Sequence, residues 1–126
     1  MRSVIVVDPI KSSLVMTSEI VKECVSGVSI KIATNGHDCL NLVDSNNFDM
    51  MIIDFDLPDT DGVSLYNLLR NTYKGPIIIM AYPSDDNVVQ DAIDKELFLY
   101  ADSAQWLHKP ISKKLLSQII QKYLMQ

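Results

Sequence analysis

Short apolar runs without alternation are the feature that most constrains how this chain folds. The clearest run extends from Met50 to Ile53 and ends at Asp54. A strand whose residues are nearly all apolar is covered on both faces, and such strands occur mainly in parallel α/β sheets. In these sheets, ligands bind beyond the carboxyl ends of the strands. We therefore predict a parallel sheet with Asp54 at its functional edge.

Apolar runs and segments of helical periodicity alternate along the whole chain. Five strands are predicted, at Val4–Val7, Val28–Ala33, Met50–Asp54, Ile77–Met80 and Ala104–His108. Five helices are predicted, over Ser13–Val25, from Asn35-Gly36 through Val43, and over Val63–Asn71, Asp85–Leu99 and Ser112–Met125. The last helix has Ser112 as its expected N-cap, and its apolar face is expected to contain Leu115, Leu116, Ile119, Ile120 and Tyr123. This alternation predicts a doubly wound sheet with right-handed crossovers.

Length and charge limit the classes of function that are open to the chain. The 126 residues suffice for one core, so residues 1–126 are predicted to form a single domain. The formal net charge of −5 and the lack of a Lys/Arg run argue against a nucleic-acid surface. Cys24 and Cys39 have no metal-site spacing and are interpreted as ordinary core thiols.

The apolar runs are also informative about location. They are only a few residues long, far below the roughly 20 residues that span a bilayer. The first residues lead directly into a strand without a signal-peptide pattern. We therefore expect a cytoplasmic protein without a membrane segment.

Polar residues follow the predicted strands at one edge of the sheet. Asp8 follows the first strand, Asp54 ends the third, Ala81-Tyr82 follow the fourth, and Lys109 follows the fifth. In the strand order 2-1-3-4-5, the first and third strands flank the switch point, and Asp8 and Asp54 face each other across it. Two carboxylates that close repel each other unless a cation lies between them. Mg²⁺ suits such oxygen ligands, and Lys109 offers a second, movable positive charge.

An aspartate, a cation and a lysine in one site are typical of phosphoryl transfer. A carboxylate can accept a phosphoryl group to form an acyl phosphate, while the metal and the ammonium group neutralise charge on the transferred oxygens. Asp54 is therefore a candidate nucleophile.

Over nearly its full length the chain resembles the receiver domains of two-component response regulators. The matching segments are Val6-Val7-Asp8, Ala33–Gly36, Asp49–Asp54, Leu57-Pro58, Asp61-Gly62, Pro76–Ile79 and Trp106–Pro110. The resemblance implies a flavodoxin-like sheet with five helices. It also implies a protein that is no enzyme beyond its own phosphoryl transfer and dephosphorylation.

The resemblance assigns roles to individual residues. Asp54 is the implied phosphoacceptor, charged from a phosphohistidine on a histidine kinase or phosphotransfer protein, and Lys109 pairs with the phosphoryl group. The Lys109-Pro110 bond is expected to be cis. Asp56 falls where the family offers a backbone carbonyl to Mg²⁺, beside Asp8 and Asp54. Trp106 takes the position of the switch aromatic, and output is expected through the helix 4, strand 5 and helix 5 face.

Three departures from the family pattern affect this site. Pro9 stands where the family commonly has its direct metal-binding acid, which predicts weak or absent Mg²⁺ binding. Ala81 replaces the usual Thr or Ser, so a charge-assisted hydrogen bond of about 1.5–3 kcal/mol to the phosphoryl group is missing. Tyr82 stands where the family has a very small residue.

The chain also departs from the family in length. The 28 positions from Ala81 to Lys109 are several more than expected and predict an extension at 96–100, which leaves room for an unusual partner or a homodimer.

Three hypotheses of function follow. The first is a phosphorylated receiver in which Asp8 and the Asp56 side chain hold Mg²⁺ weakly. The second is a pseudo-receiver, an interaction module that works without phosphorylation. The third, more remote, is a haloacid-dehalogenase-like phosphatase, since Asp54-Phe55-Asp56 matches a DxD motif. That motif normally closes the first strand of its fold, which is not the case here.

Overall fold

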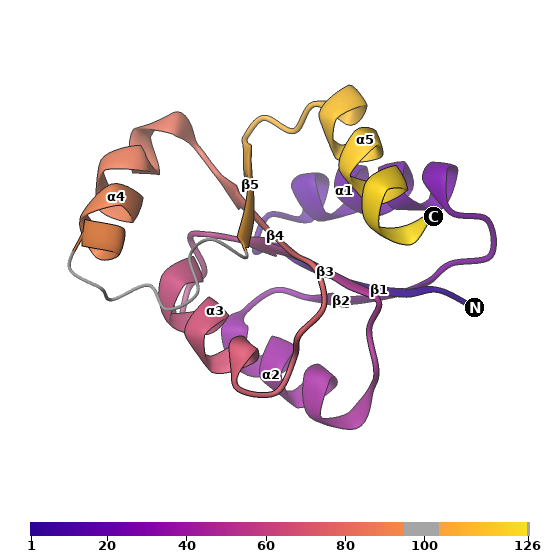
Figure 1. Cartoon of the computed structure of the whole chain (residues 1–126), viewed down its shortest axis with the longest axis horizontal. Coiled ribbons are helices and arrows are strands. Elements are labelled where there is room, and N and C mark those ends of the chain that lie inside the picture. Colours follow the sequence, from indigo (N-terminus) through magenta and orange to yellow (C-terminus); the bar gives the residue numbers. More distant parts are fainter. Residues whose placement is uncertain (95–103, 126) are drawn as a thin grey trace.

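The chain forms one five-stranded parallel sheet in the order β2-β1-β3-β4-β5 (Figure 1). The computed structural model describes residues 1–94 and 104–125. The strands are β1 (Ser3–Val7), β2 (Ser29–Ala33), β3 (Met50–Asp54), β4 (Ile77–Ala81) and β5 (Ala104–His108). The helices are α1 (Lys11–Cys24), α2 (Gly36–Ser45), α3 (Gly62–Arg70), the 3-10 turn η1 (Pro83–Asp85), α4 (Asp86–Asp94) and α5 (Lys113–Leu124). The predicted doubly wound sheet and its strand order are confirmed.

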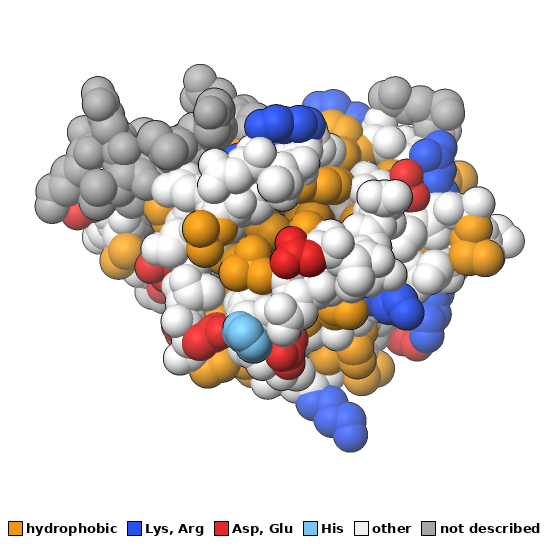
Figure 2. Space-filling view, turned by 90° about the horizontal axis from the view of Figure 1, so that it is seen from below, with side chains coloured by type: hydrophobic (Ala, Val, Ile, Leu, Met, Phe, Trp, Pro, Cys, Tyr) orange, Lys and Arg blue, Asp and Glu red, His pale blue; other side chains and the backbone are white. Residues whose placement is uncertain are grey.

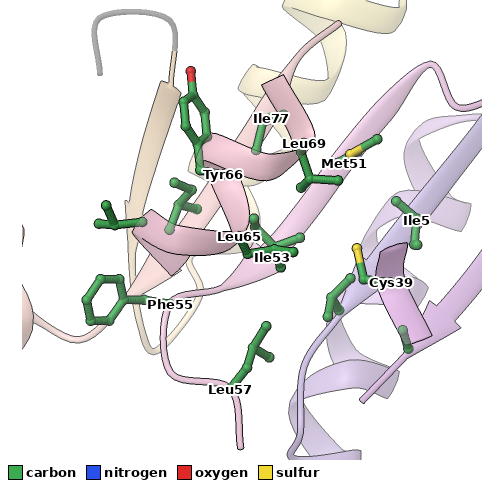
Figure 3. Packing of buried hydrophobic residues seen from close by; sticks show 14 of the residues in the cluster. Ile5, Cys39, Met51, Ile53, Phe55, Leu57, Leu65, Tyr66, Leu69 and Ile77 are labelled. Atoms are coloured by element: carbon green, nitrogen blue, oxygen red, sulfur yellow. The ribbon is translucent and has the colours of Figure 1, made fainter. Parts of the chain in front are cut away.

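The sheet separates two apolar layers. Helices α1 and α5 cover one face, and α2 and α3 lie on the other (Figure 1). Successive residues of β3 point to opposite layers, so Ile52 packs with α1 and α5 while Ile53 packs with α2 and α3. Figure 3 shows the second layer, in which Tyr66 and Leu69 of α3 pack over Ile77. Because both faces are covered, every residue of β3 is buried, which explains the apolar run without alternation.

The outer surfaces of the molecule have both hydrophobic and charged side chains (Figure 2). Figure 2 views the molecule from the side of α2 and α3, where hydrophobic side chains gather in the middle and acidic ones lie around them. Strand β2 is at the edge of the sheet, and its Ile32 is 55% exposed. No helix in the described part of the chain is long and apolar enough to cross a membrane.

The structure changes several predicted element boundaries. Helix α1 begins at Lys11, two residues before the expected start, because the Asp8 carboxylate accepts a hydrogen bond from the backbone N–H of Ile10 and fixes the entry to the helix. A 3-10 turn, η1, precedes α4, whose described part ends at Asp94. The predicted continuation to Leu99 and the extension at 96–100 lie outside the described residues.

Helix α5 has a narrower apolar face than the sequence predicts. Ser112 caps the helix as expected, since its Oγ accepts a hydrogen bond from the N–H of Leu115. Leu116, Ile120 and Leu124 are buried, but Leu115 is 50% exposed and Tyr123 is 38% exposed. The buried positions recur every four residues and form a single stripe, because α5 contacts the sheet and α1 along one line.

Candidate functional site

The predicted site residues come together at the carboxyl edge of the sheet. Asp8 follows β1 and Asp54 ends β3, and these two strands are neighbours, with Val7 opposite Ile53. Lys109 follows β5, and its backbone N–H donates to the carbonyl oxygen of Ala81, the last residue of β4. The parallel order therefore brings a residue from each of three strand ends to one point, although the strands are far apart in sequence.

Lys109 lies between the two carboxylates. Its Nζ is 2.6 Å from Oδ2 of Asp54 and 3.1 Å from Oδ2 of Asp8. The side chains of Lys109, Asp54 and Asp8 are 3%, 7% and 0% exposed. Oδ1 of Asp8 accepts from the N–H of Ile10 at 2.9 Å, and Oδ1 of Asp54 accepts from the N–H of Asp56 at 3.1 Å. Both carboxylates are thus held at each oxygen within a desolvated site.

One ammonium group shared by two carboxylates leaves an excess of negative charge. Burial raises the pKa of Asp54, because a desolvated carboxylate is disfavoured and Lys109 and the N–H of Asp56 only partly offset this cost. For Lys109, burial disfavours the charged form, but the hydrogen bonds to Asp54 and Asp8 outweigh it and raise the pKa. Lys109 therefore remains an ammonium ion, and the excess negative charge disfavours the ionised form of Asp54.

The departures from the family pattern surround this triad. Ala81 is buried, and its side chain is a methyl group that cannot donate a hydrogen bond. The ring of Tyr82 lies with its centroid 5.6 Å from Nζ of Lys109. The position after Asp8 is a proline, Pro9, which is exposed and has no carboxylate to contribute to the buried site.

The remaining predicted residues lie close to the triad but outside it. Asp56 is exposed, and its backbone pairs with Asp61 across the loop. Trp106 is half-buried on the α2 and α3 side of the sheet, with its ring 6.3 Å from that of Phe55, the residue after Asp54. The Lys109-Pro110 bond is cis, as expected. The roles of these residues stay predictions.

The donor atoms of the site are compatible with Mg²⁺, but their number is small. Asp8 and Asp54 supply carboxylate oxygens, which Mg²⁺ prefers, and the ion commonly uses one or two carboxylates together with phosphate and water. Within residues 1–94 and 104–125, no group of three or more Asp, Glu, His or Cys side chains is gathered in a way that could hold a metal ion. Lys109 already bonds both acids and therefore competes with a metal for the same oxygens.

Sequence reasoning missed Asp59, which fastens the loop after β3 to α2. Its carboxylate accepts hydrogen bonds from the N–H groups of Gly36 at 2.8 Å and His37 at 2.9 Å. A Cβ added at Gly36 would lie 2.5 Å from Cγ2 of Thr60, so the loop and the helix meet where only glycine fits. The Asn35-Gly36 turn was recognised from the sequence, but nothing local predicted its partner.

A second missed residue is Arg70, which is buried at the opposite edge of the sheet. Its Nε donates to the hydroxyl of Tyr66 at 3.0 Å, and Nη1 donates to the carbonyl oxygens of Gly75 at 2.6 Å and Tyr73 at 3.1 Å. An arginine in the last turn of a helix is normally expected to be solvated. Its position three to five residues before Tyr73 and Gly75 was the available signal.

The chain belongs to the response regulator receiver domain family, whose model matches residues 4–121. It is 28% identical to the transcription factor SKN7 of Candida albicans over 79% of this chain and 17% of that protein. It is also 28% identical to the probable transcriptional regulator ycf27 of Cyanidium caldarium, over 78% of this chain and 37% of that protein. The aerobic respiration control sensor protein ArcB of Escherichia coli is 24% identical over 96% of this chain and 15% of its own length. The chain thus spans well under half of these relatives.

Solved structures share the fold. A two-component response regulator from Clostridium difficile aligns with a TM-score of 0.82 at 23% identity, over 100% of this chain and 98% of that chain. The chemotaxis response regulator CheY4 of Vibrio cholerae aligns with a TM-score of 0.79 at 22% identity, over 98% of this chain and 99% of that chain. The molecule is therefore a receiver domain of the two-component response regulator family, and a hydrolase of the DxD type has no support beyond that motif.

Proposed function

We propose that residues 1–126 act as one receiver domain that accepts a phosphoryl group on Asp54. The observation that carries this proposal is the contact of 2.6 Å between Nζ of Lys109 and Oδ2 of Asp54, in a buried site that also contains Asp8. A buried ammonium ion next to a carboxylate at the carboxyl edge of the sheet is positioned to stabilise charge on an incoming phosphoryl group.

The transfer follows from the chemistry of these groups. A carboxylate oxygen of Asp54 forms a bond to phosphorus, and the P–N bond of a phosphohistidine breaks. The bonding electrons leave with the imidazole nitrogen, which takes up a proton from solvent. Lys109 exchanges its bond to Asp54 for a bond to a phosphoryl oxygen, while Asp8 retains the other side of the ammonium group. The donor is a histidine kinase or a phosphotransfer protein, and hydrolysis of the acyl phosphate resets the site.

Receiver domains generally bind Mg²⁺ in their acidic pocket, and here Asp8, Asp54 and the backbone carbonyl of Asp56 would hold it weakly. When bound, the ion neutralises charge on the phosphoryl oxygens. Output is proposed through α4, β5 and α5 to an effector, in a cytoplasmic protein. Trp106 of β5 lies beside Phe55, so it is positioned to respond to a change at Asp54.

A direct test is to incubate the protein with acetyl phosphate and Mg²⁺ and to measure its intact mass and its tryptophan fluorescence. Trp106 is the only tryptophan of the chain, so the signal has one source. We expect a mass increase of one phosphoryl group in the wild type and in Asp44→Asn, a control at an exposed position of α2. Asp54→Asn should show none. If wild-type protein gains no mass, the proposal of phosphoryl acceptance is wrong.

A second candidate, the pseudo-receiver, is favoured by Ala81. Its buried methyl group cannot form the bond that pulls the loop after β4 inward in the family. Two outcomes must then be distinguished. Either the protein accepts a phosphoryl group without a conformational change, or it accepts none. A mass increase with unchanged Trp106 fluorescence identifies the former. Wild-type protein that matches Asp54→Asn in both measurements identifies the pseudo-receiver.

A further inference from the structure

Tyr82 contributes an aromatic ring to the surroundings of Lys109. The ring centroid lies 5.6 Å from Nζ, within the distance at which an ammonium ion is attracted to an aromatic face. The side chain of Lys109 is nevertheless only 3% exposed, while Tyr82 is 47% exposed. A partly exposed ring thus lies next to a buried cation.

A groove of about 230 Å³ lies beside this contact. Tyr82 and Lys109 line it together with Ile10, Ser12, Ser13, Met16, Pro110 and Ile111. Lys109, one of these lining residues, has its Nζ 2.6 Å from Oδ2 of Asp54. A small donor that enters this groove therefore meets the ring of Tyr82 beside Lys109.

We propose that Tyr82 is a specificity-determining residue, whose ring covers Lys109 and restricts the access of small phosphodonors to Asp54 through this groove. The assignment deepens the proposed function and rests on Asp54 accepting phosphoryl groups. Ile10 is 47% exposed and Met16 is 41% exposed, so the groove presents apolar side chains against which a protein donor can pack. The site thereby favours a donor that is carried on a protein surface.

The physical basis is the cost of separating the ring from the ammonium ion. A cation–π contact at a partly desolvated site changes a rate by roughly 2- to 30-fold when it must be broken on the way to the transition state. Phenylalanine keeps the aromatic face, whereas alanine removes it. The hydroxyl group of Tyr82 is not required by this argument, so Tyr82→Phe and Tyr82→Ala separate the ring from the hydroxyl.

Phosphoramidate with Mg²⁺ is the probe for access to Asp54. The Asp54 carboxylate forms the bond to phosphorus, the P–N bond breaks, and the nitrogen, protonated from solvent, leaves with the bonding electrons as ammonia. We expect Tyr82→Ala to form the adduct roughly 2- to 30-fold faster than wild type by intact mass, and Tyr82→Phe to remain close to wild type. Tyr123→Ala is the matched control, because Tyr123 is also exposed and has Nζ of Lys122 at 5.2 Å from its ring. A rate in Tyr82→Ala no higher than in Tyr123→Ala overturns the proposal.

A second measurement does not depend on phosphorylation. Trace labelling with acetic anhydride acetylates accessible lysine amines and releases acetate, and peptide mass spectrometry then compares Lys109 with Lys122 in the same sample. Tyr82→Ala should raise the labelling of Lys109 relative to Lys122, and Tyr82→Phe should not. If no variant forms an adduct with phosphoramidate but Lys109 becomes accessible in Tyr82→Ala, the proposal of phosphoryl acceptance is wrong. The claim that Tyr82 covers Lys109 is then still supported. Unchanged labelling overturns the role of Tyr82.

Discussion

Two cations are buried at opposite edges of the same sheet, and their surroundings differ. Lys109 lies at the carboxyl edge and bonds the carboxylates of Asp8 and Asp54. Arg70 lies at the amino edge and donates to the Tyr66 hydroxyl and to backbone carbonyls of the loop before β4. The first arrangement concentrates charge, whereas the acceptors described for the second are neutral oxygens.

The difference matches the chemistry of the two side chains. Arginine has a planar fork of donors that holds several fixed acceptors at once, which suits a loop that must keep one conformation. Lysine is a compact charge on a flexible stem and can exchange one oxygen for another. We infer that the amino edge is built for stability and the carboxyl edge for change, and four substitutions test this comparison.

The largest expected effect is that of Lys109→Met. Removal of the ammonium group leaves Asp8 and Asp54 as buried carboxylates without a counter-charge, which should lower the free energy of unfolding by about 3–5 kcal/mol in urea titrations at pH 7. Lys113→Met is the control, because Lys113 pairs with Glu23 at 2.6 Å on an exposed surface and its loss should change little. Equal effects in the two variants would contradict the importance of the buried triad.

The stability of wild-type protein and that of Lys109→Met should depend on pH in different ways. The pKa of Lys109 is raised, so its stabilising contribution is complete below the unfolded value of about 10.4 and is lost as the pH rises through the native pKa. Wild-type protein should therefore lose stability in this alkaline range, and Lys109→Met should lack that part of the loss.

Arg70→Met should have the next largest effect. The substitution leaves the carbonyl oxygens of Tyr73 and Gly75 without their donor and should cost about 1–3 kcal/mol. Hydrogen exchange should increase in the loop between α3 and β4, while the mass increase with acetyl phosphate is unchanged. Arg70→Lys retains the charge without the fork, and recovery of full stability in that variant would contradict the comparison drawn above.

Asp54→Asn should increase stability by roughly 0.5–2 kcal/mol at pH 7, because Lys109 then faces a single carboxylate. The pKa of Asp54 is raised by burial, so its ionised form destabilises the native protein above the native pKa, and this penalty disappears as the pH falls through that value. The advantage of Asp54→Asn should shrink accordingly in urea titrations from pH 7 to pH 4. A variant less stable than wild type at pH 7 would show that the bond from Lys109 outweighs the excess charge.

The sequence predicted the fold well where local pattern determines it. Strands β3 and β5 were predicted to the residue, since β3 is a short apolar run that ends at Asp54 and β5 is a short run that ends at His108, just before Lys109 and Pro110. The meeting of Asp8, Asp54 and Lys109 followed from the rule that parallel strands end at one edge. The start of α1 was placed too late because its entry depends on a hydrogen bond to Asp8 and not on a side-chain cap.

Contacts between distant segments were not predictable in this way. The ring of Tyr82 over Lys109 joins residues 27 positions apart, and the bond of Asp59 to Gly36 spans 23 positions. Asp59 and Arg70 bond to backbone groups. Because every residue has a backbone, the residue types in the sequence do not indicate which positions provide these partners. Burial of Arg70 was likewise decided by tertiary packing.

The smallest expected effect is that of Asp59→Asn at the margin of the carboxyl edge. Hydrogen bonds from the N–H groups of Gly36 and His37 hold the pKa of Asp59 below its usual value. Its contribution to stability is therefore present above the unfolded pKa of about 3.9 and is lost as the pH falls through the lower native value. The variant should have a slightly lower urea midpoint than wild type at pH 7, and the difference should vanish in acid. Amide exchange at Gly36 and His37 should increase, whereas Asp44→Asn in the same helix should change neither quantity. Persistence of the difference at acidic pH would show that Asp59 acts through packing and not through its charge.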